Sequence, residues 1–254
     1  MLLCPVRGCH LPLTREEKRL VCERAHSFDV SRRGYVNLLQ PQDKRSKHPG
    51  DTEEAVAGRM RVHDLGLTVP LLRGIEEMVQ PTHKDVVLDA GCGDGFYLGR
   101  MVREHGISAH GVDISTEAIE AAAKRYPHCE WIVANADRFI PYADHSFSLA
   151  LSITGRMNPA EFKRVLKFHS RLLVAIPAPD DLIELRSEGR DRAERTIAEF
   201  APLFELKTQR RITTHADLDA AAVIGLRHAI YRPLSDEPPK AMRVTFSLDC
   251  FLFA

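Results

Sequence analysis

The sequence is poor in aromatic residues and contains no long apolar run. Aromatic side chains make up 7% of the 254 residues, with a single tryptophan. No stretch approaches the roughly 18 consecutive apolar residues that a membrane-spanning helix requires. The opening "MLLCPVRG" lacks the basic segment and apolar core of a secretion signal. We therefore expect no membrane contact and a cytoplasmic location, where cysteines are more often metal ligands or buried side chains than disulfides.

The chain also lacks a net charge, although its charges are unevenly distributed. It contains 35 Lys and Arg against 35 Asp and Glu. Residues 1–50 hold ten Lys or Arg and five Asp or Glu, which gives +5 there and −5 in the remainder. A basic amino-terminal segment is typical of proteins that contact a polyanion, and an uneven but merely solvated surface is the alternative.

Cysteine is scarce, and half of it lies near the amino terminus. Cys4, Cys9, Cys22 and His26 follow the spacing C-x4-C-x12-C-x3-H. Zinc takes four sulfur or nitrogen ligands tetrahedrally, and two close pairs on separate turns can enclose one ion. We therefore predict a zinc site formed by these four residues, with His10 as the alternative second ligand. The remaining cysteines stand singly in apolar surroundings and are expected in the core: Cys92, Cys129 and Cys250.

From about residue 83, apolar strands alternate with helical segments. Strands separated by helices indicate a parallel sheet covered on both faces. We predict an α/β fold with a mostly parallel, doubly wound, Rossmann-like sheet. Beyond residue 205, two strands flanking a helix would close the sheet with an antiparallel pair. The expected earlier strands cover residues 86–88, 107–113, 129–137, 146–154 and 171–177.

The first of these strands leads into a glycine-rich turn, "DAGCGDG", at residues 89–95. Glycines let the backbone pass close beneath a bound ligand, where a side chain would collide. Asp113 ends the next strand, where a carboxylate can accept hydrogen bonds from both hydroxyls of a ribose. The turn lacks the G-x-G-x-x-G signature of dinucleotide binding and resembles the S-adenosylmethionine site of class I methyltransferases. A doubly wound domain for another nucleotide is the alternative. The expected cofactor-binding residues are Asp89, Gly91, Gly93, Asp94, Gly95, Asp113, Asn135 and Asp137.

The predicted zinc site and the residues it encloses, 4–26, form a zinc knuckle. The segment between this knuckle and the sheet is basic and rich in turn-forming residues. Phe28 and Tyr35 in it could stack on bases or simply pack. Helices are expected over residues 52–67 and 70–79. The side chains that could neutralise phosphates are Arg32, Arg33, Lys44, Arg45 and Lys47.

The knuckle, "HSFDVSRRGYVNLL", "DKRSKHPGD" and "LDAGCGDG" together resemble the RlmA-type guanine-N1 methyltransferases of large-subunit ribosomal RNA. The similarity covers essentially the whole chain and is most specific over residues 4–51 and 87–95. It implies methylation of guanine N1 in 23S rRNA, with zinc and S-adenosyl-L-methionine as cofactors. It also implies that Gly93 and Asp94 touch the methyl donor.

The same resemblance implies a division of the chain. A zinc-binding module over residues 1–38 would grip a hairpin of 23S rRNA. A basic linker and connecting helices would occupy 39–80, and the methyltransferase domain 81–254. The oligomeric state stays open, a homodimer being one option.

The sequence departs from the family pattern at several points. The family has C-x2-C where Cys4 and Cys9 have four residues between them. Thr68 replaces an aromatic cofactor contact, and Asp181 replaces a histidine after the fifth strand. The family's "AP" element after the fourth strand is replaced by Thr154, Gly155 and Arg156.

The sequence does not identify a catalytic residue. Asp137 and Asp181 are weak candidates for the base that removes the guanine N1 proton. Phe96, Tyr97 and Tyr142 could stack on a base that has left its helix, although packing is the more common role. Two other functions stay open: a methyltransferase acting on another RNA base or a small molecule, and a non-catalytic RNA-binding relative.

Overall fold

The computed structural model describes residues 1–43, 49–155, 157–186, 188–228, 230 and 238–254. The basic residues Lys44, Arg45 and Lys47 of the linker, and Arg156 after the fourth strand, lie outside these ranges. No helix among the described residues is long and apolar enough to cross a membrane.

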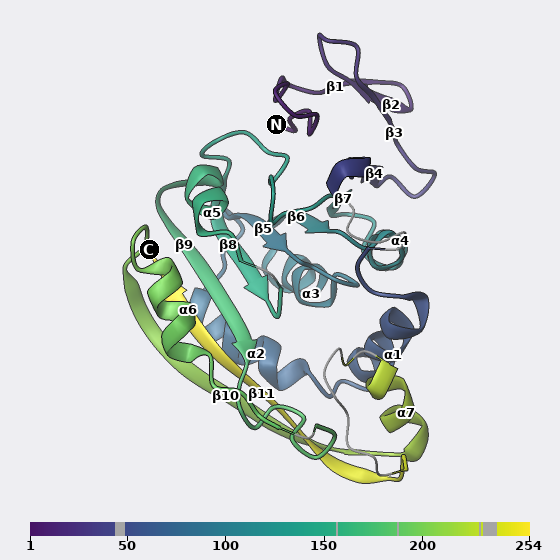
Figure 1. Ribbon diagram of the computed structural model, residues 1–254, viewed down its shortest axis with the longest axis vertical. Coiled ribbons are helices and arrows are strands. Elements are labelled where there is room, and N and C mark those ends of the chain that lie inside the picture. The colour runs from purple at the N-terminus through teal and green to yellow at the C-terminus, as the bar shows by residue number, and fades with distance from the viewer. Residues whose placement is uncertain (44–48, 156, 187, 229, 231–237) are drawn as a thin grey trace.

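A large twisted sheet runs through the molecule (Figure 1). In the described residues it has eight strands in the order β10-β11-β9-β8-β5-β6-β7-β4. Only β11 runs antiparallel to its neighbours, β9 and β10, and the other pairs are parallel. The strands are β4 (Val36–Asn37), β5 (Val86–Ala90), β6 (Ser108–Asp113), β7 (Glu130–Val133), β8 (Phe147–Ile153), β9 (Leu166–Pro177), β10 (Leu206–Leu218) and β11 (Met242–Phe253).

Helices cover both faces of this sheet, because successive strand residues point to opposite sides. Val87 of β5 joins the core beneath α2, α3, α4 and α7, and its neighbour Leu88 joins the core beneath α5 and α6. The helices are α1 (Glu53–Asp64), α2 (Val69–Val79), α3 (Phe96–His105), α4 (Thr116–Arg125), α5 (Pro159–Val165), α6 (Ala193–Phe200) and α7 (Ala220–His228). The predicted doubly wound sheet with a closing antiparallel pair is therefore confirmed.

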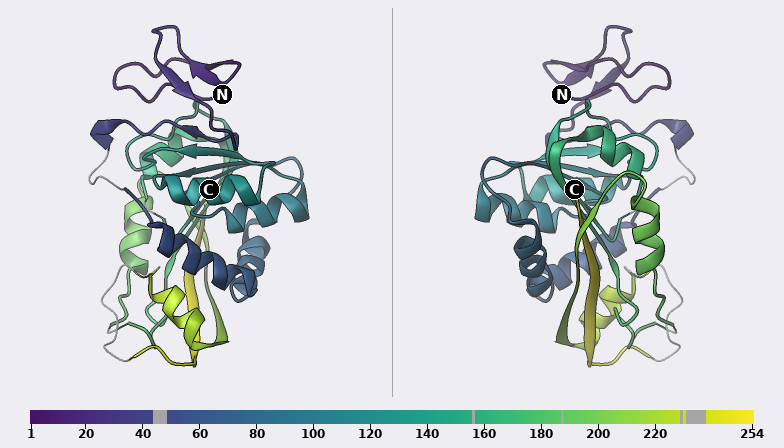
Figure 2. Two further views of the ribbon diagram at one scale, coloured as in Figure 1. Left: turned by 90° about the vertical axis from the view of Figure 1, so that its right-hand side faces the viewer. Right: turned by 90° about the vertical axis from the view of Figure 1, so that its left-hand side faces the viewer.

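The amino-terminal segment forms a small module at the end of the molecule far from α7 (Figures 1 and 2). Three short antiparallel strands, β1 (Thr14–Glu16), β2 (Arg19–Val21) and β3 (Ser27–Asp29), make a sheet of their own. The next strand, β4, instead pairs with β7 at the edge of the large sheet. Buried side chains of the module, Leu13 and Leu20 among them, share a core with the face of the large sheet covered by α5. The module is thus docked on the rest of the chain.

The sequence predictions differ from the structure mainly at element ends. β9 begins at Leu166, five residues before the predicted start, since residues 167–170 bulge between the pairs Phe147–Leu166 and Leu149–Arg171. Helix α6 was not predicted from the sequence. A short 3-10 turn, η1 (Pro41–Asp43), precedes the basic stretch of the linker.

Candidate metal centre and cofactor site

The four predicted zinc ligands converge although they belong to two separate turns. Their ligand atoms all lie within 4.8 Å of one another. The Cys9 and Cys22 sulfurs are 3.8 Å apart, and His26 Nδ1 lies 3.4 Å from the sulfurs of Cys4 and Cys22. Zinc bonded tetrahedrally at about 2.3 Å to sulfur and about 2.0 Å to nitrogen gives sulfur–sulfur edges of about 3.8 Å and sulfur–nitrogen edges of about 3.5 Å. The donor set therefore fits one tetrahedral zinc ion.

Each turn of the knuckle contains a residue in the left-handed region directly before its second ligand. Gly8 (φ 72°) precedes Cys9, and Ala25 (φ 62°) precedes His26. Arg24, on the second turn, donates from Nη1 to the carbonyl oxygen of Gly8 over 2.8 Å and so joins the two turns. The cluster is thus held by matched local backbone geometry as well as by its spacing.

His10, the alternative ligand, does not belong to the cluster. Its ring stacks on Phe139 with 4.3 Å between the ring centroids. Phe139 lies in the loop between β7 and β8, and this loop contacts the module through its backbone as well. Leu3 donates to the carbonyl of Pro141, and Arg138 donates from Nη2 to the carbonyl of Pro5 over 2.8 Å.

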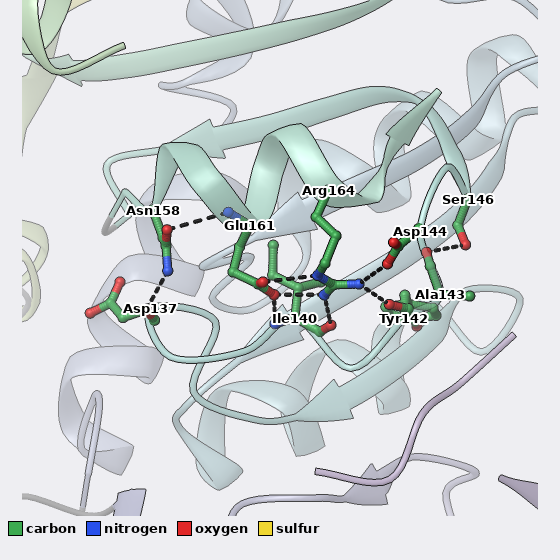
Figure 3. A network of polar contacts seen from close by, with 9 residues as sticks. All are labelled: Asp137, Ile140, Tyr142, Ala143, Asp144, Ser146, Asn158, Glu161 and Arg164. Atoms are coloured by element: carbon green, nitrogen blue, oxygen red, sulfur yellow. Dashed lines mark hydrogen bonds and ion pairs between the residues drawn. The ribbon is translucent and has the colours of Figure 1, made fainter. Parts of the chain in front are cut away.

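The same loop is fastened from its other side by α5 (Figure 3). The Arg164 guanidinium donates to the backbone carbonyls of Ile140 and Tyr142, each over 2.7 Å. It also pairs with Glu161, whose carboxylate accepts the backbone N–H of Ile140 over 2.7 Å. Asn158 caps α5 and donates to the carbonyl of Asp137. Loop residues 137–144 are therefore fixed between α5 and the zinc module.

The glycine turn lies where β5 ends and α3 begins. Gly91, Gly93 and Gly95 all have positive φ angles, which side chains disfavour. A Cβ on Gly95 would collide with Trp131, and a Cβ on Gly93 would come within 3.0 Å of Arg59 Nη1. The two amides at the turn, Gly91 and Cys92, donate to the carbonyl of Val112 in the next strand. The backbone of the turn is thus held close against β6.

Three carboxylates gather around this turn. Asp113 accepts the backbone N–H of Gly93 (2.9 Å) and of Ser115 (2.8 Å), yet burial raises its pKa. Asp89 is 1% exposed, and its Oδ1 has no hydrogen-bond partner among the described residues. Burial, with Asp113 and Asp94 nearby, raises the pKa of Asp89 to about 8. The turn therefore presents a buried carboxylate without a counter-charge.

The third carboxylate, Asp94, is paired. His63 Nδ1 lies 3.1 Å from its Oδ2, and both side chains are buried. Burial opposes ionisation of Asp94, but the charge and hydrogen bond of His63 outweigh it and hold the pKa of Asp94 below its ordinary value. The Asp94 side chain thus serves to hold α1 on the turn.

The end of β7 lies along the same edge of the sheet. Asn135 Oδ1 accepts the backbone N–H of Asp137, and its amide nitrogen donates to the carbonyl of Asp43. Asp43 also pairs with Arg138 over 2.6 Å. The predicted cofactor residues therefore divide into a group at the glycine turn and a second group, Asn135 and Asp137, at the end of β7.

Sequence reasoning missed a third contributor, the segment that enters α1. Asp51 and Arg59 form an ion pair of 2.5 Å, and the Asp51 carbonyl accepts the Ser115 hydroxyl over 2.9 Å. Arg59 and His63 stand four residues apart and so share one face of the helix. That spacing, just ahead of the sheet, was the signal available in the sequence.

The other candidates are mostly packing residues. Phe96 is buried and stacks on His63, and the Tyr142 hydroxyl is buried against Glu130. Asp181 is buried, pairs with Arg186 over 3.1 Å and accepts the backbone N–H of Ser247. Such a carboxylate is poorly placed to remove a proton from a substrate.

Thr68 begins α2 without capping it, and its buried hydroxyl has no partner among the described residues. Phe28 and Tyr35 are partly buried against the cores, and Arg33 pairs with Glu120 over 3.0 Å. Tyr97 is partly buried, and burial raises its pKa.

Comparisons with known proteins agree with this geometry. A family model described as "RlmA, N-terminal" matches residues 2–47, and one described as "Methyltransferase domain" matches residues 87–175. A 23S rRNA (guanine(748)-N(1))-methyltransferase of Streptomyces fradiae is 35% identical over 234 residues, which cover 87% of this chain and 81% of the relative. Among solved structures, a TehB-like SAM-dependent methyltransferase of Corynebacterium glutamicum gives a TM-score of 0.50 at 18% identity, over 80% of this chain and 97% of the other. The fold is that of the class I methyltransferases.

Proposed function

The chain belongs to the family of the 23S rRNA (guanine-N1)-methyltransferases, and we propose that it transfers a methyl group to N1 of a guanine in 23S rRNA. Its cofactors are S-adenosyl-L-methionine and zinc. The reaction takes place in the cytoplasm. The guanine named for the Streptomyces relative, number 748, is the first position to examine.

The observation that carries the cofactor assignment is the unpartnered carboxylate of Asp89. A buried carboxylate without a counter-charge is costly, and a cationic ligand relieves that cost. S-adenosylmethionine has an ammonium and a sulfonium group, and it supplies an activated methyl group when bound. Asp89 would hold the cationic end, Asp113 the ribose, and Asn135 with Asp137 the adenine. Gly91, Gly93 and Gly95 would allow the positive φ angles with which the backbone of the turn passes close to the ligand.

Because the methyl group is already activated, the residues of this chain mainly have to align the acceptor with it. N1 lies on the pairing edge of guanine, so the base must come from a loop or leave its stack. The zinc module, residues 1–38, would hold the RNA hairpin while residues 81–254 perform the transfer.

The direct test is transfer of labelled methyl groups to unmodified 23S rRNA, mapped by reverse transcription. Methylation at N1 blocks base pairing, so a cofactor-dependent stop at one guanine would establish the reaction and its position together. Label without a stop would indicate another atom or base. Tight cofactor binding without any label on RNA would favour a small-molecule substrate, and absence of cofactor binding would favour a non-catalytic RNA-binding protein.

The oligomeric state requires a separate measurement. Sedimentation at the enzyme concentration of the assay, with and without RNA, would distinguish a monomer from a homodimer.

A further inference from the structure

The guanidinium group of Arg59 reaches the glycine turn. Its Nη1 would lie 3.0 Å from a Cβ built on Gly93. Its Nη2 pairs with Asp51 over 2.5 Å. The side chain is 28% exposed, so it faces partly toward solvent at the surface of the turn.

The surroundings of Arg59 are strongly acidic. Burial would lower its pKa, but the nearby carboxylates of Asp51, Asp94 and Asp113 hold that pKa above its ordinary value. The nearby imidazole of His63 is buried and already contacts Asp94. A ligand carboxylate that approached the turn would therefore meet repulsion from three acids unless Arg59 received it.

A guanidinium group can donate hydrogen bonds to two carboxylates at once, because it has five N–H donors. The Asp51 pair engages Nη2, which leaves the Nη1 side directed along Gly93. Asp51 is itself fixed, since its carbonyl accepts the Ser115 hydroxyl and Gly50 packs tightly on Ser115. Arg59 is thus held over the turn before any ligand arrives.

We propose that Arg59 binds the α-carboxylate of the amino-acid end of S-adenosylmethionine. The inference rests on the proposed function, since it assigns one more group of the cofactor to one more residue. Asp89 then receives the ammonium group and Arg59 the carboxylate, so that both charges of the zwitterion meet an opposite charge. The backbone N–H groups at the start of α3 are the competing acceptor of that carboxylate.

The experiment compares ligands that carry this carboxylate with ligands that lack it. Calorimetry would measure the binding of S-adenosylmethionine, decarboxylated S-adenosylmethionine, S-adenosylhomocysteine and 5′-methylthioadenosine to the zinc-loaded full chain. The variants are Arg59→Met, Arg59→Lys and the control Arg61→Met. Arg61 lies on the same helix, is half exposed and is 3.8 Å from Asp219 on another part of the surface.

Arg59→Met should weaken S-adenosylmethionine and S-adenosylhomocysteine by about 10- to 100-fold, the range expected for a charged hydrogen bond. The two ligands without a carboxylate should bind within about twofold of wild type, which also proves that the variant is folded. Arg59→Lys should give an intermediate loss, because it keeps the charge without the guanidinium group. Arg61→Met should change none of the four affinities.

Equal losses for all four ligands would mean that Arg59 only supports the fold, and unchanged affinity would mean that the α3 amides hold the carboxylate. Either result would overturn this inference while leaving the proposed function intact. A wild-type chain that binds none of the four ligands would instead overturn the proposed function, and this inference with it.

Discussion

The zinc knuckle and the cofactor site gather their polar groups over very different lengths of chain. The knuckle takes all four ligands from residues 4–26, on two short turns. The proposed cofactor site combines Asp51 and Arg59 ahead of the sheet with Asp89, Asp113 and Asn135 at three strand ends. The knuckle can therefore form wherever its metal is present, whereas the cofactor site exists only once the whole sheet has folded. The predictions below use this difference, beginning with the largest expected effect.

Removing a zinc ligand should separate the two regions most clearly. Cys22→Ser should release zinc, because it removes one of the four ligands. The module should then be strongly destabilised, since structural zinc contributes about 10 kcal/mol or more to the folding of small metal modules. Methylation of 23S rRNA should fall to background, while S-adenosylmethionine affinity stays within about threefold of wild type. Metal analysis, calorimetry and the methylation assay on one preparation would test this. Cys129→Ser, a cysteine outside the cluster, is the control.

Loss of cofactor binding in Cys22→Ser would contradict the comparison. It would mean that the knuckle is needed to order the sheet edge, through the contacts that residues 2–5 make with the loop before β8.

Arg164 tests the connection between the two regions. Arg164→Met should lower the free energy of unfolding by about 3 kcal/mol, since it removes a bidentate pair and leaves the carboxylate of Glu161 without its partner. The loop at Ile140 and Tyr142 should loosen, with faster hydrogen exchange at Leu3. Zinc content should nevertheless stay at one ion per chain. Denaturant unfolding and metal analysis, with the exposed substitution Lys167→Met as control, would measure both.

Zinc loss in Arg164→Met would show that the knuckle depends on its docking loop. In that case the two regions would unfold as one cooperative unit. The short sequence span of the knuckle and the long span of the cofactor site would then have no consequence for stability.

Asp89 tests the cofactor site through pH. Its pKa of about 8 lies above that of an ordinary carboxyl group, so the folded, ligand-free chain keeps a proton on it at neutral pH. Stability from this group is therefore full at low pH and declines as pH rises toward 8, because the unfolded chain releases the proton earlier. A bound cation favours the carboxylate, so S-adenosylmethionine should bind more tightly as pH rises from 6 to 8, with proton release.

The matching variant is Asp89→Asn. It should weaken S-adenosylmethionine by about 100-fold and yet stabilise the ligand-free chain at pH 8 by about 2 kcal/mol, because no buried charge has to form. Calorimetry in two buffers of different ionisation enthalpy would count the protons released. Affinity independent of pH between 6 and 8, in a wild-type chain that binds, would contradict the charge assigned to Asp89.

The same difference in chain length decides what the sequence could predict. Four ligand residues within 23 positions leave a spacing that can be read directly, and the alternation of strands and helices predicted the sheet and its antiparallel closure. Glycines and acids at strand ends marked one side of the cofactor site. Arg59 and Asp51 left a weaker signal, because Gly93 and Ser115, which they approach, lie far away in sequence and charged residues ahead of a sheet resemble any solvated ones.

The smallest expected effect comes from the two left-handed positions of the knuckle. Ala25 is strained by its Cβ at φ 62°, whereas Gly8 adopts φ 72° without strain. Ala25→Gly should therefore stabilise the zinc-loaded module by about 1 kcal/mol, and Gly8→Ala should destabilise it by a similar amount. No atom lies within 4 Å of a Cβ built on Gly8, so backbone conformation alone would cause that loss. Competition with a zinc chelator would measure both variants against wild type. If both substitutions changed the stability in the same direction, contacts and not φ would set the energy of these turns. Changes in opposite directions, with S-adenosylmethionine affinity unchanged in both variants, would show that the stability of the knuckle depends on its own few residues, independently of the sheet beneath it.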